Sequence, residues 1–304
     1  MYDLVIVGSG ISSLSFLKGL KKRNRKIGLI SYESSKKISN KSILNEYIDN
    51  SNYPPRFKFN NHNLSSVYNY FNKNNLKVKK DVSIFGMLSN GGASNYWGCS
   101  SQFLDNTDID FLNKKNRNNL NNSFQEIYKK YNFTGNYNLK NKSKINKINT
   151  TQKILKEIIE KINSRFVKFY ANCIASNYKN GQDFTPKNIF KEVENKFIYL
   201  NYFVKKIKKN KNFYEIYCEK DNNKIIIKTK KLVLAAGTIA TTKLVCEMLN
   251  YKKKIKINHN PMLFGCFVLK NSFKKNESNF LPSKLAAEIV SNKNKFKATA
   301  NFRG

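Results

Sequence analysis

Residues 3–13 read Asp-Leu-Val-Ile-Val-Gly-Ser-Gly-Ile-Ser-Ser, and this stretch decides the fold. Its first part, residues 3–7, is a short apolar run of the kind that forms a buried parallel strand. Leucines then recur at steps of three over residues 11–22, which predicts a helix. A second apolar run lies at 27–30, so strand, glycine turn, helix and strand follow one another in about 30 residues. The N-terminus therefore predicts a βαβ unit.

The turn between the first strand and the helix reads Gly8-Ser9-Gly10-Ile11-Ser12-Ser13. Gly8 permits a tight turn, and Gly10 lets the backbone approach a pyrophosphate at the positive end of the helix dipole. Ser13 stands where a third glycine usually allows close helix–strand packing, and serine is small enough for that role. The turn predicts a dinucleotide site at Gly8, Gly10 and Ser13, with an ordinary glycine turn as the alternative.

The same motif needs an acidic residue after the second strand, where a carboxylate holds the hydroxyls of the adenosine ribose. Glu33 is the candidate nearby, whereas a plain count along the chain places the acid at Ser31, two residues earlier. Glu33 is the predicted ribose-binding residue, and a solvated surface glutamate is the alternative.

A second glycine-rich stretch, Gly91-Gly92-Ala93-Ser94-Asn95-Tyr96-Trp97-Gly98, resembles the flavin loop of the glucose–methanol–choline (GMC) oxidoreductase family. It is most similar to the G-G-x-S-x-x-W form of pyranose oxidase-like sugar oxidoreductases. In that family the loop runs under the isoalloxazine, where large side chains would clash. Trp97 either belongs to this arrangement or simply anchors the loop in the core. The resemblance implies FAD as cofactor, lying beside Gly91, Gly92, Ala93, Ser94 and Asn95.

The residues around this loop also depart from the family pattern. Some relatives attach FAD covalently through a histidine at the position of Tyr96, so the tyrosine implies noncovalent FAD. The arginine or lysine and the aliphatic residue that often precede the double glycine in the family are both missing, and Leu88 and Asn90 occupy those places.

A third stretch, Leu232-Val-Leu-Ala-Ala-Gly237-Thr-Ile-Ala-Thr-Thr242, resembles the strand–glycine–helix segment A-A-G-x-x-x-T-P of the same family. Thr242 replaces the proline. The resemblance implies that Ala236, Gly237 and Thr241 lie near the dinucleotide. It also implies that Val204, at the end of a preceding strand, contacts the adenine, with an ordinary core valine as the alternative.

The catalytic base is unknown. In the GMC family it is a histidine close to the C-terminus, paired with a second histidine or an asparagine. This chain has His62 and His259, and neither lies in a matching motif. The resemblance thus covers the family's N-terminal and middle portions, and we expect the C-terminal catalytic region to be absent.

Two function hypotheses follow from the resemblance. The first is an FAD-dependent oxidoreductase that acts on CH–OH groups of sugars or other alcohols, with hydride transfer to the flavin. The second is a truncated or split, noncatalytic FAD-binding remnant, completed by a second polypeptide.

The composition excludes several other classes. The net charge is +36, but lysine, asparagine and isoleucine are over-used throughout, so we expect no specific nucleic-acid partner. The five cysteines include no C-x-x-C pair, which argues against a disulfide framework or a zinc site and favours a cytoplasmic location. No apolar run is long enough to span a bilayer.

The predicted architecture is α/β, with a Rossmann-like FAD-binding domain and part of a second, sheet-containing substrate domain. The FAD-binding domain covers 1–250, with polar excursions at 34–80 and 112–150, and 251–304 begins the incomplete substrate domain. We expect helices near 64–71, at 151–162 and from residue 238 to about 250. Strands are expected at 197–204, 213–218, 225–229, 232–236, 264–269 and 295–302.

Overall fold

The computed structural model describes residues 1–21, 25–33, 61–76, 86–96, 109–134, 167–171, 174–177, 184–221, 223–257, 285–291 and 296–302. Its residues group into two compact units. The first comprises Met1–Trp97 and Thr185–Asn258, and the second comprises Gly98–Phe184 and His259–Gly304. The predicted FAD-binding domain over 1–250 and substrate domain over 251–304 stay predictions, because compactness assigns no function to either unit.

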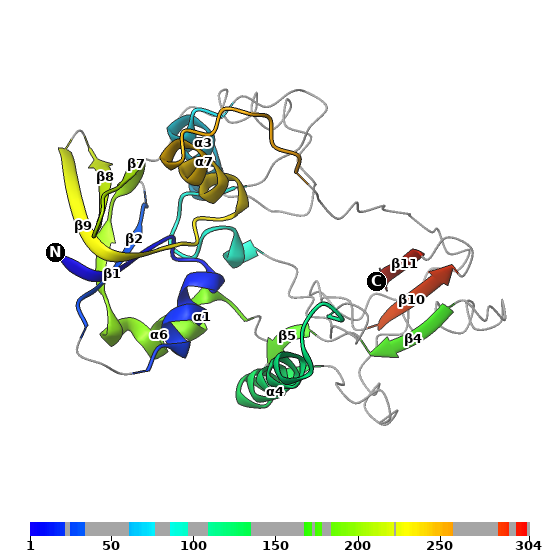
Figure 1. Ribbon diagram of the computed structural model, residues 1–304. Helices are drawn as coiled ribbons and strands as arrows, with labels where there is room; N and C mark the ends of the chain where they lie inside the picture. The colour runs from blue at the N-terminus through cyan, green and yellow to red at the C-terminus, as the bar shows by residue number, and fades with distance from the viewer. Residues whose placement is uncertain are drawn as a thin grey trace. The chain divides into compact units, whose positions relative to one another are not determined.

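The first unit is built on a six-stranded sheet (Figure 1). Its strands are β1 (Tyr2–Val7), β2 (Ile27–Ser31), β6 (Ile198–Asn201), β7 (Phe203–Lys209), β8 (Tyr214–Lys220) and β9 (Asn223–Leu234). Their order is β6-β2-β1-β9-β8-β7. β1 pairs in parallel with β2 and β9, β2 pairs in parallel with β6, and helix α1 (Ile11–Gly19) connects β1 to β2. The predicted βαβ unit and the Rossmann-like α/β class are confirmed.

β9 is one strand of 12 residues, whereas the sequence predicts two strands at 225–229 and 232–236. Its first part pairs antiparallel with β8 and its last part pairs parallel with β1, and Thr229 has a partner in both strands. Figure 1 shows it curving from one neighbour to the other. The lysines at 230 and 231 are exposed, and exposed polar residues do not interrupt a strand that keeps its backbone partners.

The opposite correction applies at 197–204, where the sequence predicts a single strand. β6 ends at Asn201 and β7 begins at Phe203. The backbone N–H of Tyr202 donates to the carbonyl oxygens of Ser31 and Leu200, at 3.2 and 3.0 Å. The chain turns at this residue from the parallel strands into the antiparallel ones.

One core cluster of described residues spans the parallel and antiparallel strands. It contains Val5, Val7, Ile30, Val204, Ile207, Ile216, Cys218, Ile227 and Leu244. Buried residues such as Ile6 and Leu29 alternate with these along β1 and β2, so they point to the other face of the sheet. Each fully buried aliphatic side chain contributes about 1.5–3 kcal/mol to folding.

Among the described residues, four α-helices lie in the same unit as this sheet. α1 contacts α6 (Pro186–Val193), and α7 (Thr238–Met248) contacts β7. α3 (Asn61–Asn74) packs against α7, because Val67, Tyr70 and Phe71 form a buried cluster with Ala240 (Figure 1). The predicted helices near 64–71 and from 238 are therefore confirmed.

The second unit contains a helix that the sequence does not predict. α4 (Lys114–Tyr131) lies within the stretch 112–150, for which the composition predicts little structure. The Asn113 side chain accepts a hydrogen bond from the Asn116 N–H at 2.9 Å and caps the helix. Tyr128 and Phe133 pack edge to face in this unit. The prediction failed because it weighed the many asparagines and lysines of this stretch and overlooked its few aromatic residues.

The remaining described elements of the second unit are strands. β4 (Val167–Ala171), β10 (Leu285–Ser291) and β11 (Phe296–Phe302) form an antiparallel sheet of order β11-β10-β4, and β3 (Phe133–Thr134) pairs with β5 (Ile174–Asn177). The predicted strand at 295–302 is confirmed. The predictions at 151–162 and 264–269 lie outside the described residues.

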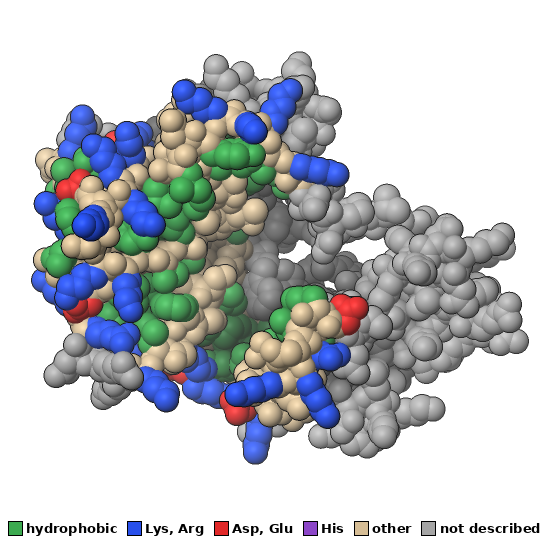
Figure 2. Space-filling model, in the orientation of Figure 1, with side chains coloured by type: hydrophobic (Ala, Val, Ile, Leu, Met, Phe, Trp, Pro, Cys, Tyr) green, Lys and Arg blue, Asp and Glu red, His purple; other side chains and the backbone are tan. Residues whose placement is uncertain are grey.

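Lysine and arginine side chains are scattered over the described surface that faces the viewer in Figure 2, without gathering in one stripe. The edge strand β7 alone carries four exposed lysines, Lys205, Lys206, Lys208 and Lys209. Charged edges of this kind disfavour pairing with another chain. Within the described residues, no helix has the length and apolar character needed to cross a membrane.

Candidate functional site

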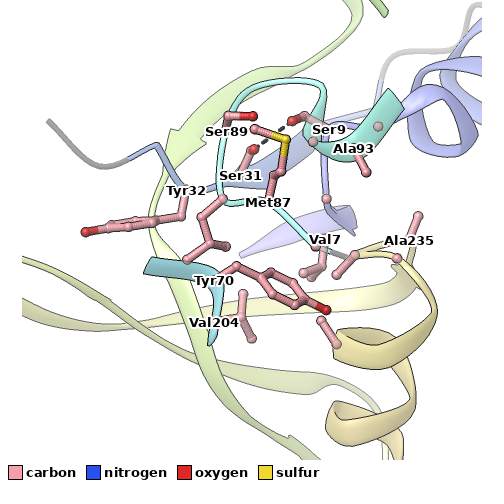
Figure 3. A pocket seen from close by; sticks show the side chains of 18 of the residues that line it. Val7, Ser9, Ser31, Tyr32, Tyr70, Met87, Ser89, Ala93, Val204 and Ala235 are labelled. Atoms are coloured by element: carbon pink, nitrogen blue, oxygen red, sulfur yellow. Dashed lines mark hydrogen bonds between the residues drawn. The ribbon is translucent and has the colours of Figure 1, made fainter. Parts of the chain in front are cut away.

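A cavity of about 370 Å³ lies at the carboxyl ends of β1, β2 and β9 (Figure 3). β2 and β6 lie on one side of β1, and β9 lies on the other, so the strand order reverses at this point. In open α/β sheets, ligands bind at such a reversal, outside the carboxyl ends of the strands. The volume falls in the range of small-molecule sites.

Gly8 sits where two strand-end loops touch. Its φ is +103°, and its N–H donates to the Ile30 carbonyl oxygen at 2.7 Å. A Cβ on Gly8 would overlap the Ala235 carbonyl and lie 2.9 Å from the Ala236 Cα. Both the backbone angle and the close contact therefore require glycine.

Gly10 is the N-cap of α1 and provides no side chain to cap the helix amides. The N–H of Ile11 donates to the Ser94 Oγ at 3.2 Å. A Cβ on Gly10 would lie 3.3 Å from that same Oγ. Gly10 thus permits the glycine loop at 91–94 to approach α1, in addition to leaving the helix N-terminus open.

Ser13 is fully buried within the first unit and does not line the cavity. Its Oγ has no hydrogen-bond partner among the described residues. This position fits the predicted role of a small residue at a packing contact, and it offers no contact to a ligand in the cavity.

A chain of side-chain hydrogen bonds ties the glycine loop to the strands. The Ser9 and Ser31 hydroxyls lie 2.7 Å apart, and the Gly91 N–H donates to the Ser9 Oγ at 3.0 Å. The Tyr199 hydroxyl donates to the Asn90 Oδ1 at 2.9 Å. Burial raises the pKa of Tyr199, while a hydrogen bond with Ser31 opposes that rise.

The loop itself is closed by Asn95. Gly91 and Gly92 have φ values of +82° and +53°. The Asn95 Nδ2 donates to the Asn90 carbonyl oxygen at 2.6 Å, and a Cβ on Gly91 would lie 2.7 Å from the Asn95 Oδ1. The Asn95 side chain therefore stabilises the loop by bonding to its own backbone, and Asn95 does not line the cavity. The lining residues from this loop are Gly91, Gly92, Ala93 and Ser94.

At the β9–α7 junction, Ala236 and Gly237 line the cavity and Thr241 does not. The Thr241 Oγ1 accepts a hydrogen bond from the Ala236 N–H at 3.1 Å. Gly237, the N-cap of α7, has a φ of +82° and likewise provides no capping side chain. Thr241 holds the turn, and the two residues before the helix face the cavity.

Val204 lines the cavity beside Tyr32 and Phe203, whose rings pack edge to face with centroids 5.9 Å apart. Glu33 is not among the lining residues, and its N–H donates to the Asn201 Oδ1 at 3.0 Å. From β2, Ile30 and Ser31 line the cavity, and Ser31 stands at the position that a plain count along the motif indicates.

Several lining residues come from segments that sequence reasoning did not connect with the site. They include Tyr70, Asn74, Met87 and Ser89. Val67, Tyr70, Phe71 and Asn74 follow helical spacing and are buried, so the periodicity of α3 is a usable signal. The Ser89 Oγ is buried at the cavity without a partner among the described residues.

The described lining contains no Lys, Arg, Asp, Glu or His. Two helix N-termini, those of α1 and α7, supply its positive potential instead.

No group of three or more His, Cys, Asp or Glu within the described residues could hold a metal ion. The thiol of Cys218 lies in the core, where burial raises its pKa to about 12. The side chains of Tyr96, His62 and His259, and Trp97 as a whole, lie outside the described residues.

The fold and cavity define a Rossmann-like α/β protein with a ligand-sized cavity at the reversal of strand order. Among solved structures, the chain is similar to a pyridoxine 4-oxidase from Mesorbium loti, with 10% identity and a TM-score of 0.49. The similarity covers 81% of this chain and 51% of that one, so this chain spans about half the length of that structure. No protein-family model matches the chain, and no curated protein matches it.

Proposed function

We propose that this chain binds FAD noncovalently, as a member of the flavoprotein oxidoreductases. The observation that carries the proposal is the meeting of two glycine-capped helices at one cavity. α1 begins after Gly10 and α7 begins after Gly237, and both first turns line the cavity. The amides of a helix's first turn have no acceptor within the helix and favour an anion such as a pyrophosphate.

The other lining residues fit the remaining parts of a flavin dinucleotide. Val204, between Phe203 and the core, would contact the adenine. The small residues at 91–94 would leave room for the isoalloxazine, in keeping with their resemblance to the GMC flavin loop. The unpaired Ser89 Oγ would find a partner in a polar ligand, which removes the cost of about 1–3 kcal/mol for a buried hydroxyl without one.

The substrate class rests on the resemblance of the loop at 91–98. It favours oxidation of a CH–OH group of a sugar or another alcohol, for which bound FAD would supply the hydride acceptor. We propose Gly8, Gly10, Gly91, Gly92, Ala93, Ser94, Val204, Ala236 and Gly237 as cofactor-contacting residues. Three further residues would stabilise this arrangement without touching the cofactor, namely Ser13, Asn95 and Thr241.

A second candidate function is FAD binding without turnover. Oxidation of an alcohol needs a base for the hydroxyl proton. The described lining of the cavity contains no carboxylate, imidazole or amine, and this observation favours the second candidate.

FAD binding is tested by titrating the purified chain with FAD in a calorimeter and by recording the visible flavin spectrum of the complex. We expect saturable binding, and acid precipitation should leave all the flavin in the supernatant. Absence of binding would overturn the proposal as a whole. Flavin that stays with the precipitate would overturn only its noncovalent part.

A further inference from the structure

Tyr70 on α3 places a buried phenol at the wall of the cavity. It is 5% exposed and packs in a cluster with Val67, Phe71, Met87 and Ala240. Gly86 lies directly against its ring, and a Cβ at that glycine would overlap the ring carbons. Gly86 therefore leaves the space that the ring occupies.

The Tyr70 hydroxyl lies at the start of α7. In Figure 3 the Tyr70 ring extends across the cavity from α3 and points its oxygen toward the side where Ala235 and α7 lie. The hydroxyl of Tyr32 points away from the other labelled residues in the same view. Burial raises the pKa of Tyr70, and a hydrogen bond with the Ala240 backbone opposes that rise. The phenol is thus neutral at physiological pH.

The backbone group of Ala240 that faces the Tyr70 hydroxyl determines whether this hydroxyl acts as a donor or as an acceptor toward a ligand. Ala240 is in the first turn of α7, where backbone N–H groups have no acceptor within the helix. A first-turn N–H group can act only as a donor to the phenolic oxygen, and such a contact leaves the phenolic proton available to a ligand. A buried O–H donor then stands beside the first-turn amides of α7.

We propose that Tyr70 contacts the ligand and donates a hydrogen bond to a phosphate oxygen of the dinucleotide at the N-terminus of α7. This inference rests on the proposed function and assigns one phosphoryl group to each helix. The close contact of Gly8 with Ala235 and Ala236 brings the turn before α1 and the turn before α7 together. A pyrophosphate placed there faces α1 through one phosphate and α7, with Tyr70, through the other.

The test compares Tyr70→Phe with the wild type, using ADP and adenosine as calorimetric probes. Phenylalanine keeps the ring against Gly86 and removes only the hydroxyl. A hydrogen bond to a charged group contributes about 1.5 kcal/mol or more, so we expect ADP to bind about tenfold more weakly. The affinity for adenosine, which has no phosphate, should change less than about twofold.

Tyr217→Phe is the matched control. It removes a hydroxyl that donates to the Glu215 Oε2 at 3.2 Å and does not line the cavity. It should leave the affinities for both probes unchanged. Thermal melting of all three proteins shows whether each variant is folded.

A role of Tyr70 in packing alone would weaken both probes equally, or lower the melting temperature without changing the ratio of ADP to adenosine affinity. Either result would overturn the inference, as would equal binding of the two probes by the wild type. Failure of the wild type to bind FAD or either probe would instead refute the proposed function. ADP binding by Tyr70→Phe at wild-type strength would refute the Tyr70 contact alone.

Discussion

At the scale of single residues, the glycines of the cavity meet different demands. Gly8 is required by its φ and by the backbone of Ala235. A Cβ at Gly237 would meet nothing within 4 Å, so its φ alone requires glycine there. Gly10 has an extended backbone that any residue adopts, and its constraint is the nearby Ser94 hydroxyl. Glycine is therefore needed for different reasons at the three positions: a positive φ with a close contact at Gly8, a positive φ alone at Gly237, and a close contact alone at Gly10.

Gly8→Ala should destabilise the protein by at least about 2 kcal/mol, because it adds a strained φ to an overlap with the Ala235 carbonyl. Denaturant unfolding followed by circular dichroism measures this difference. The matched control is Gly19→Ala at the end of α1, where a Cβ would meet nothing within 4 Å. That control should be neutral or stabilise by up to about 1 kcal/mol. Equal stability of the two variants would show that the β1–α1 turn relaxes freely.

At the scale of secondary-structure elements, the site depends on how strands end. β9 ends at Leu234. The two alanines that follow, Ala235 and Ala236, pack against Gly8, and α7 begins after them. The Ala235 N–H donates to the Val7 carbonyl oxygen at 2.8 Å, which extends the pairing of β1 and β9 into the turn. The junction is thus held by backbone pairing on one side and by Thr241 on the other.

Thr241→Val should weaken this junction, because it keeps the shape of the side chain and leaves the Ala236 N–H without its acceptor. The expected loss of unfolding free energy is about 1–2 kcal/mol. FAD affinity should fall as well, since Ala236 and Gly237 line the cavity. Thr241→Ser keeps the hydroxyl and should restore most of both quantities. If the valine variant matched the wild type in denaturant midpoint, the hydrogen bond would be of no consequence.

At the scale of the whole molecule, the cavity combines a strongly basic chain with a lining that carries no formal charge. The net charge is +36, yet the described lining offers an anion only backbone amides, hydroxyls and the Asn74 carboxamide. Charges elsewhere raise the local concentration of an anionic ligand without identifying it. Recognition of an anionic ligand is therefore expected to come from backbone amides and neutral polar side chains.

We predict that the purified chain with FAD oxidises no alcohol at an appreciable rate. The described lining offers no carboxylate, imidazole or amine to act as base, and the loss of a positioned base costs about 10² to 10⁴ in rate. The measurement is anaerobic mixing with a panel of aldoses and alcohols while the flavin absorbance is followed. Dithionite serves as the control, since it should bleach the flavin directly. Rapid bleaching by any substrate would contradict the prediction, and His259→Ala would be the next variant to examine.

Much of this architecture follows from the sequence alone. The apolar runs at 3–7 and 27–30 and the glycine turn between them predict the βαβ unit, because local periodicity and glycine geometry are properties of neighbouring residues. The same reasoning predicts a tight turn at Gly8 and a close backbone approach at Gly10, whereas Gly91, Gly92 and Gly237 are singled out by their resemblance to the GMC motifs.

Tertiary structure decided which residues line the cavity. Tyr70 and Ser89 reach it from segments that no local pattern links to the strand ends, and Asn95 and Thr241 belong to matching motifs yet lie behind it. Ser31 lines the cavity and Glu33 does not, because the pairing of β2 with β6 ends at Ser31 and the Glu33 backbone N–H then donates to the Asn201 side chain. A side chain's neighbours across the chain depend on strand order and packing, which the local sequence does not encode. The sequence by itself thus determined the βαβ unit and its glycine turns, and only the tertiary structure decided which side chains face the ligand site.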